Sequence, residues 1–160
     1  MAFVYGFGKD TEAAYTTHAS TNTDDPTIVL RQTARNCDLQ ALYCLGRGTG
    51  LTAITGIGYR VRRWTTVGTG GTALANVAPR RIGTTASTAI VDKATAITPG
   101  TVSGAVQVAF GCGAAGPGGW VARDEDSKIT MEAGSSDELD INSVAGVTAM
   151  SHQLSGEISE

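Results

Sequence analysis

Charged residues are scarce in this 160-residue sequence, and histidine is almost absent. Asp, Glu, Lys and Arg make up 17% of the chain, below the roughly 25% typical of globular domains, and the formal net charge is -3. A protein that binds nucleic acid usually presents a strongly basic face, so this composition argues against direct binding to nucleic acid. His18 and His152 are the only histidines, and neither HExxH nor GxSxG occurs. We therefore expect no enzyme and no cofactor.

Cysteine pairs, long apolar runs and a signal peptide are also missing. Cys37, Cys44 and Cys112 are odd in number, and no CxxC spacing suggests a zinc site. We interpret them as free, buried thiols, with a Cys37–Cys44 disulfide as the alternative. No run approaches the roughly 18 apolar residues of a membrane span. The segment from Met1 lacks the signal-peptide pattern, so we expect an intracellular product without membrane contact.

The abundant residues favour strands joined by turns over helices. Glycine occurs 21 times, and Thr and Ser are common. Apolar and polar residues alternate in several segments, which is the period of a half-buried strand. In the last segment Met150, His152, Leu154 and Ile158 share one face, on which a packed histidine is the simplest interpretation. Strands are predicted at 27–33, 37–45, 51–66, 101–111, 118–122, 128–134, 138–143 and 149–160.

Two of these segments carry further expectations. A short helix from Asp38 is the competing interpretation of 37–45, because Leu39, Leu42 and Tyr43 also fit helical spacing. In 101–111 the residues predicted to point inward are Val102, Val106, Val108 and Phe110.

Together these patterns predict an all-β fold. We expect a single-domain antiparallel sandwich, with a jelly roll as its topology. Residues 1–26 form an N-terminal arm and a polar loop, and 27–160 form the sandwich domain, with a long Gly/Thr-rich loop at 65–98. Residues 1–8 are either a short strand or an extended arm laid on a neighbouring chain. A loop as long as 65–98 is expected to reach a partner.

Two motifs resemble ligand sites but have simpler interpretations. Residues 111–116 match GxGxxG, yet Pro117 prevents the helix that a dinucleotide site needs, so we interpret them as a loop. The acidic turns at 124–126 and 137–140 carry oxygen ligands that calcium prefers, but their spacing does not fit a calcium loop. We interpret them as solvated turns and expect no bound metal.

One basic and one aromatic group of residues are candidates for contacts with other subunits. The arginines near Trp64 are either a solvated strand face or a patch that meets an acidic partner. Aromatic residues are enriched at interfaces between proteins. The predicted contact residues are Phe3, Tyr5, Phe7, Arg60, Arg62, Arg63, Trp64, Arg80, Arg81 and Trp120.

The C-terminal quarter also resembles a known family. The segments GGWVA at 118–122 and KITMEAG at 128–134, and the closing strand 154–160, are similar to small virion proteins of tailed phages. More narrowly, they resemble capsid decoration, or cement, proteins of the jelly-roll type. The resemblance implies a homotrimer at three-fold axes of the shell that clamps neighbouring major capsid proteins. It also implies a protein made in the host cytoplasm and located on the virion surface.

Two other functions fit the same composition. A tail or baseplate component would form hexameric rings from a helix-flanked sandwich. A carbohydrate-binding jelly roll would need exposed aromatic side chains over a groove, for which Tyr59, Trp64 and Trp120 are the candidates.

Overall fold

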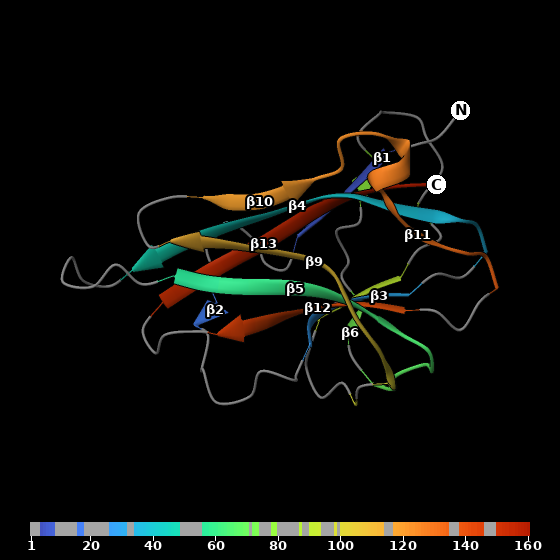
Figure 1. Ribbon diagram of the computed structural model, residues 1–160, viewed down its shortest axis with the longest axis horizontal. Helices are drawn as coiled ribbons and strands as arrows, with labels where there is room; N and C mark the ends of the chain where they lie inside the picture. The colour runs from blue at the N-terminus through green and yellow to red at the C-terminus, as the bar shows by residue number, and fades with distance from the viewer. Residues whose placement is uncertain are drawn as a thin grey trace.

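The chain folds as two antiparallel β-sheets packed face to face (Figure 1). The structure, a computed structural model, describes residues 4–8, 16–17, 26–31, 34–48, 56–70, 72–73, 78–79, 87, 90–93, 98, 100–113, 117–134, 138–145 and 150–160. Within these residues no α-helix occurs, and no helix is long and apolar enough to cross a membrane. The predicted all-β antiparallel sandwich is therefore confirmed, whereas the jelly-roll topology stays a prediction.

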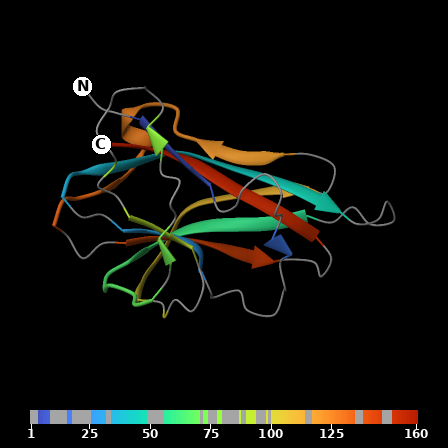
Figure 2. The same ribbon diagram turned by 180° about the vertical axis from the view of Figure 1, so that it is seen from behind.

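The first sheet is built around the C-terminal strand. Its order is β10-β4-β13-β1-β7, with β11 beside β4 and β2 beside β13. The last strand thus lies in the middle of the sheet, as the view from behind also shows (Figure 2). The strands are β1 (Val4–Gly8), β2 (Thr16–Thr17), β4 (Cys37–Gly48), β7 (Ala78–Pro79), β10 (Gly118–Val121), β11 (Ile129–Met131) and β13 (Met150–Ser159).

The second sheet has the order β6-β8-β3-β12-β5-β9. The stretch 65–98, which was predicted as a loop, contains strands β6 and β8 of this sheet. It also contains β7 of the first sheet. The stretch has few large apolar residues, so its strands depend on ladders from distant partners such as β3. The strands are β3 (Pro26–Arg31), β5 (Gly56–Trp64), β6 (Thr72–Ala73), β8 (Ile90–Lys93), β9 (Val102–Gly113) and β12 (Glu138–Ala145).

The structure decides between the alternatives left open for two segments. Cys37–Gly48 is a strand rather than a helix, because it forms ladders with β13 on one side and with β10 and β11 on the other. Val4–Gly8 is a strand rather than an arm, since it pairs with β13 over its whole length. Tyr5 and Phe7 are 0% and 3% exposed, so their rings belong to the core of the chain itself.

The hydrophobic core fills the space between the sheets. Both sheets contribute alternate residues, and the phenol ring of Tyr59 stacks on Phe110 with 5.4 Å between ring centroids. Val106 was predicted to face this core but is 50% exposed. The reason is a register shift in the β5–β9 ladder, where Val61 pairs with Val108 but Arg62 pairs with Val106. The core residues include Tyr5, Phe7, Ile28, Leu30, Leu39, Leu42, Tyr59, Val61, Met131, Leu139, Ile141, Leu154 and Ile158.

Gly156 of β13 leaves room for an aromatic ring in this core. It lies between Phe7 of β1 and Leu42 of β4 in the two ladders. A Cβ atom at position 156 would be 2.5 Å from Cζ of Phe7 and 2.7 Å from the carbonyl oxygen of Ala41. The absence of a side chain therefore permits the Phe7 ring to pack over the backbone of the central strand.

We expect Gly156→Ala to lower the free energy of unfolding by about 1–3 kcal/mol, because the methyl group overpacks the site. Gly8→Ala is the matched control, since its Cβ would meet Cβ of Ser155 at 3.6 Å and the carbonyl oxygen of Leu154 at 3.9 Å, both ordinary contacts. The control should stay within about 0.5 kcal/mol of the parent in urea unfolding. Equal effects of the two substitutions would contradict this account of Gly156.

Candidate functional site

Strand β12 places three polar residues on the face of the second sheet that points away from the core. Glu138, Asp140 and Asn142 alternate with the core residues Leu139 and Ile141. All three are nevertheless buried, with exposed fractions of 3%, 0% and 0%. The interpretation of 137–140 as a solvated turn is therefore wrong for Glu138 and Asp140, which lie on a buried strand. A buried carboxylate is strongly unfavourable unless it is paired and hydrogen-bonded. The neighbouring strands must therefore supply partners.

Arginines of β5 provide two of these partners. Nε of Arg62 lies 3.1 Å from both carboxylate oxygens of Asp140, and Nε of Arg60 donates to Oδ1 of Asn142 at 2.9 Å. Arg62 itself is 7% exposed. The interpretation of these arginines as a solvated strand face is therefore wrong for Arg62. Its partner is a carboxylate of the same chain, 78 residues further along, so the strand pattern around Arg62 alone could not reveal it.

The segment 65–70, which we call the strap, covers Trp64 on this same face. Arg31 pairs with Glu138 at 3.1 Å and donates to the carbonyl oxygen of Gly70 at 3.1 Å. The backbone N–H of Gly68 donates to Glu138 at 2.9 Å. A Cβ atom on Gly68 would clash with the Trp64 ring, so glycine allows the strap to lie flat on the indole. Trp64 is 0% exposed as a result.

The remaining predicted contact residues are scattered. Arg63 connects the sheets by donating to the carbonyl oxygen of Thr130 at 2.8 Å, and Trp120 is partly buried against the core. The structure thus brings Arg60, Arg62 and Trp64 together on one face. Outside the described part of the chain lie Phe3, His18, Arg80, Arg81, residues 114–116 of the glycine motif, and the side chains of Cys112 and His152.

The two described cysteines are free thiols on β4. Cys37 and Cys44 are seven residues apart on one strand, so their Cα atoms are separated by roughly 20 Å, far beyond disulfide reach. The alternative of a Cys37–Cys44 disulfide is therefore wrong. Burial, followed by the nearby charges of Glu160 and Asp38, raises the pKa of the Cys37 thiol to about 12.

An open groove lies on the outer face of the first sheet, and we call it the first-sheet groove. Its volume is about 550 Å³, and its floor includes Ala41 and Tyr43 of β4 and Val121 of β10. Tyr43 is 41% exposed and Val121 is 55% exposed. A register shift in the β4–β13 ladder beside Gln40 puts Gln40 and Ala41 on this same face.

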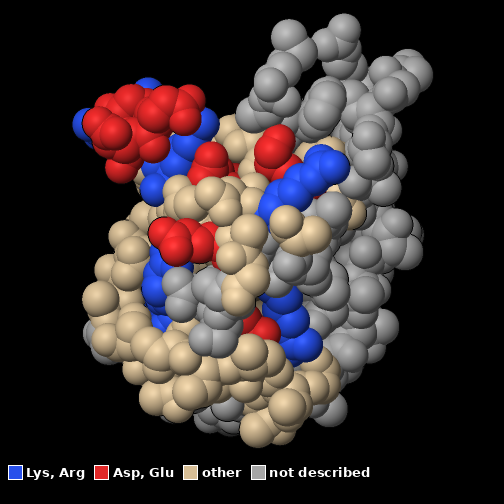
Figure 3. All heavy atoms as spheres, turned by 90° about the vertical axis from the view of Figure 1, so that its right-hand side faces the viewer, with Lys and Arg blue, Asp and Glu red and all other residues tan. Residues whose placement is uncertain are grey.

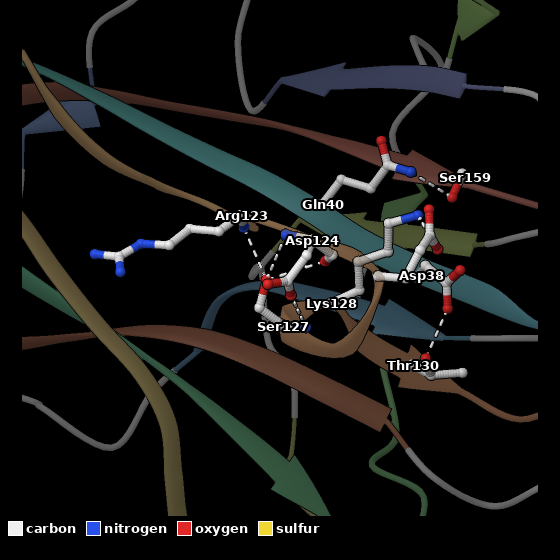
Figure 4. Close-up of polar contacts among 9 residues, drawn as sticks. Asp38, Gln40, Arg123, Asp124, Ser127, Lys128, Thr130 and Ser159 are labelled. Carbon is white, nitrogen blue, oxygen red and sulfur yellow. Dashed lines mark hydrogen bonds and ion pairs between the residues drawn. The ribbon is translucent and has the colours of Figure 1, made fainter.

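A short 3₁₀ turn, η1 (Glu125–Ser127), forms one wall of the groove (Figure 4). Asp124 caps the turn by accepting from the N–H of Ser127 at 2.9 Å, and the Ser127 hydroxyl accepts from the N–H of Asp124 at 3.0 Å. Lys128 pairs with Glu125 at 2.6 Å. The acidic residues therefore act as a cap and an ion pair. No group of three or more metal-ligating side chains occurs in the part of the chain that the structure describes.

Sequence reasoning missed this groove, although one signal points to it. Residues 41–45 read ALYCL, so Tyr43 and Leu45 continue the apolar character on the outward side of β4. A strand that is apolar on both faces indicates a second contact surface. The sequence around η1 does not predict that this turn forms a wall of the groove, because the ladder of β10 with β4 sets its position.

Among the described residues, charges of both signs lie side by side on the end of the molecule seen in Figure 3 and form no continuous basic surface there. A scan against protein-family models, a search of curated proteins and a search of solved structures found no match for this chain.

We expect Arg62→Met to lower the free energy of unfolding by about 3–5 kcal/mol near pH 7, because it leaves the Asp140 carboxylate buried without its cation. Lys128→Met is the control, since Glu125 in its ion pair is largely exposed. That control should change stability by about 0.5 kcal/mol or less. Urea unfolding measures both variants.

The stability deficit of Arg62→Met should shrink as the pH is lowered from about 7 to about 4. Burial raises the pKa of the Asp140 carboxyl, and the hydrogen bond and charge of Arg62 oppose that rise. Without Arg62, the Asp140 carboxyl binds a proton more readily in the folded state than in the unfolded chain. Stability then falls as the pH rises from the ordinary pKa to the raised one. A deficit that does not change with pH would contradict this role of Asp140.

Proposed function

We propose that this chain is a structural virion protein that stabilises a phage capsid. In this proposal it binds as a homotrimer on the outer surface of the shell formed by the major capsid protein. The similarity of 118–122, 128–134 and 154–160 to decoration proteins supports the proposal. The structural observation that supports it best is the uncharged edge strand β9.

Strand β9 is a long sheet edge without charge. It has 12 residues, none of them charged, and pairs with β5 on one side. The other strands at the ends of the sheet orders are shorter: β6 and β7 have two residues each and β10 has four. Short or charged edges protect against pairing with other chains, and interface cores are depleted of charge. Exposed residues of β9 include Ser103, Ala105, Val106, Gln107 and Ala109.

This edge suits the mechanical role of a clamp. A protein that binds only the expanded shell adds its binding free energy to the stability of that state. Three linked copies increase avidity, because the second and third contacts form at high effective concentration. In a three-fold arrangement each β9 meets a different surface of the next copy, which closes a ring of three. Such a function needs contact surfaces and no chemical step.

We expect native mass spectrometry and analytical ultracentrifugation to give three copies in solution. Val106→Lys should raise the concentration for half-assembly about tenfold or more, because it places a charge in the contact. Val67→Lys is the control: Val67 is 56% exposed but lies in the strap, outside β9. A monomeric parent protein, or equal effects of the two lysines, would contradict the trimer.

Binding to the shell is tested separately by cosedimentation with expanded and with immature phage capsids. We expect binding to the expanded shell only, at three copies per site. Binding to isolated tails in multiples of six would instead favour a tail or baseplate component. The carbohydrate-binding alternative loses two of its three candidate residues, because Tyr59 and Trp64 are both fully buried and cannot stack on a sugar from solvent.

A further inference from the structure

We propose that the first-sheet groove is a binding site for a neutral glycan chain. This inference goes beyond the clamp function and does not depend on it, because the groove lies on the first sheet and β9 belongs to the second. Its volume of about 550 Å³ falls within the roughly 300–1,000 Å³ of ligand sites in proteins. The aromatic residue involved is Tyr43, which was not among the candidates read from the sequence.

The ring of Tyr43 is exposed because its cross-strand neighbours are small. Gly119 of β10 lies opposite Tyr43 on one side, and Ser155 of β13 lies opposite on the other. A Cβ atom at position 119 would lie too close to the carbonyl oxygen of Leu42, so a side chain cannot be added there without a shift. Tyr43 is 41% exposed, so its ring is available to stack against the apolar C–H face of a sugar.

The charges that line the groove select against an ionic ligand. Arg123 and Lys128 are cations, and Asp124, Glu125 and Glu157 are anions. A phosphate or carboxylate would approach three acidic side chains, and an ammonium group would approach two basic ones. A hydroxyl group both donates and accepts hydrogen bonds, so it can use either kind of side chain. A neutral, hydroxyl-rich chain is therefore the ligand class that this lining fits.

Internal contacts hold much of this lining in place before a ligand arrives. Lys128 is paired with Glu125, and Asp124 caps the 3₁₀ turn, so the side chains of Lys128 and Asp124 already have partners that orient them. Nε2 of Gln40 donates to the hydroxyl of Ser159 at 2.7 Å, which orients the amide. The guanidinium group of Arg123 extends away from the turn (Figure 4), where it can donate to ligand oxygens. The groove thus offers a fixed polar wall beside an apolar floor.

The test is an NMR titration of the ¹⁵N-labelled full chain with cellohexaose, maltohexaose and chitohexaose as neutral probes. Oligogalacturonate and oligolysine serve as anionic and cationic probes of similar length. We expect at least one neutral hexasaccharide to bind and to shift the amide signals of Tyr43, Val121 and Arg123. Tyr43→Ala should weaken this binding about tenfold or more.

Leu45→Ala is the matched control, because Leu45 is 39% exposed on the same strand face but does not line the groove. It should bind like the parent, and the thermal midpoints of both variants check that they fold. Three results would overturn the proposal: no neutral probe binding up to about 10 mM, tighter binding of a charged probe, or equal binding by Tyr43→Ala and Leu45→Ala. Val106→Lys should bind the glycan like the parent, which separates this outcome from that of the clamp function.

Discussion

The ladder formed by β13 is the interaction on which most of this molecule depends. The strand pairs with β4 at ten positions and with β1 at five, so the first strand of the chain lies directly beside the last. Its inward residues Leu154 and Ile158 enter the core, and its outward residue Glu157 lines the first-sheet groove. Core packing and groove shape are therefore set by one strand register, because a slip by one residue would exchange its two faces.

The two sheets use their outer faces differently. The outer face of the second sheet is buried over β12 and the end of β5: the strap covers Trp64, and arginines of β3 and β5 bind the polar residues of β12. Replacement of a buried ion pair by apolar residues can leave the free energy of unfolding unchanged. We therefore interpret the ion pairs on this face as contacts that specify where the strap lies. The first sheet keeps its outer face open over Tyr43 and Val121. Among the described residues, that groove and the β9 edge are the surfaces that we propose for partners.

Alternation along the chain located most strands because each long strand has one face in the core. It favoured a strand over a helix for 37–45, and the ladders of β4 decided between the two. It failed where pairing is irregular. Val106 was misplaced because a register shift in the ladder with β5 moves it to the outer face. The short strands between 65 and 98 show no clear alternation of apolar and polar residues, so they are identified only by the strands with which they pair.

The sequence alone was sufficient for the fold class, since low charge, many glycines and period-two patterns are local properties. It also showed which strands have an apolar face. Tertiary structure decided which side chains meet: Arg62 with Asp140, Phe7 with Gly156, and Tyr43 with Gly119. These pairs join residues 76 to 149 positions apart, and their register depends on how two sheets close around one core. A buried charge, a required glycine and a groove are properties of such pairings, so no single segment specifies them.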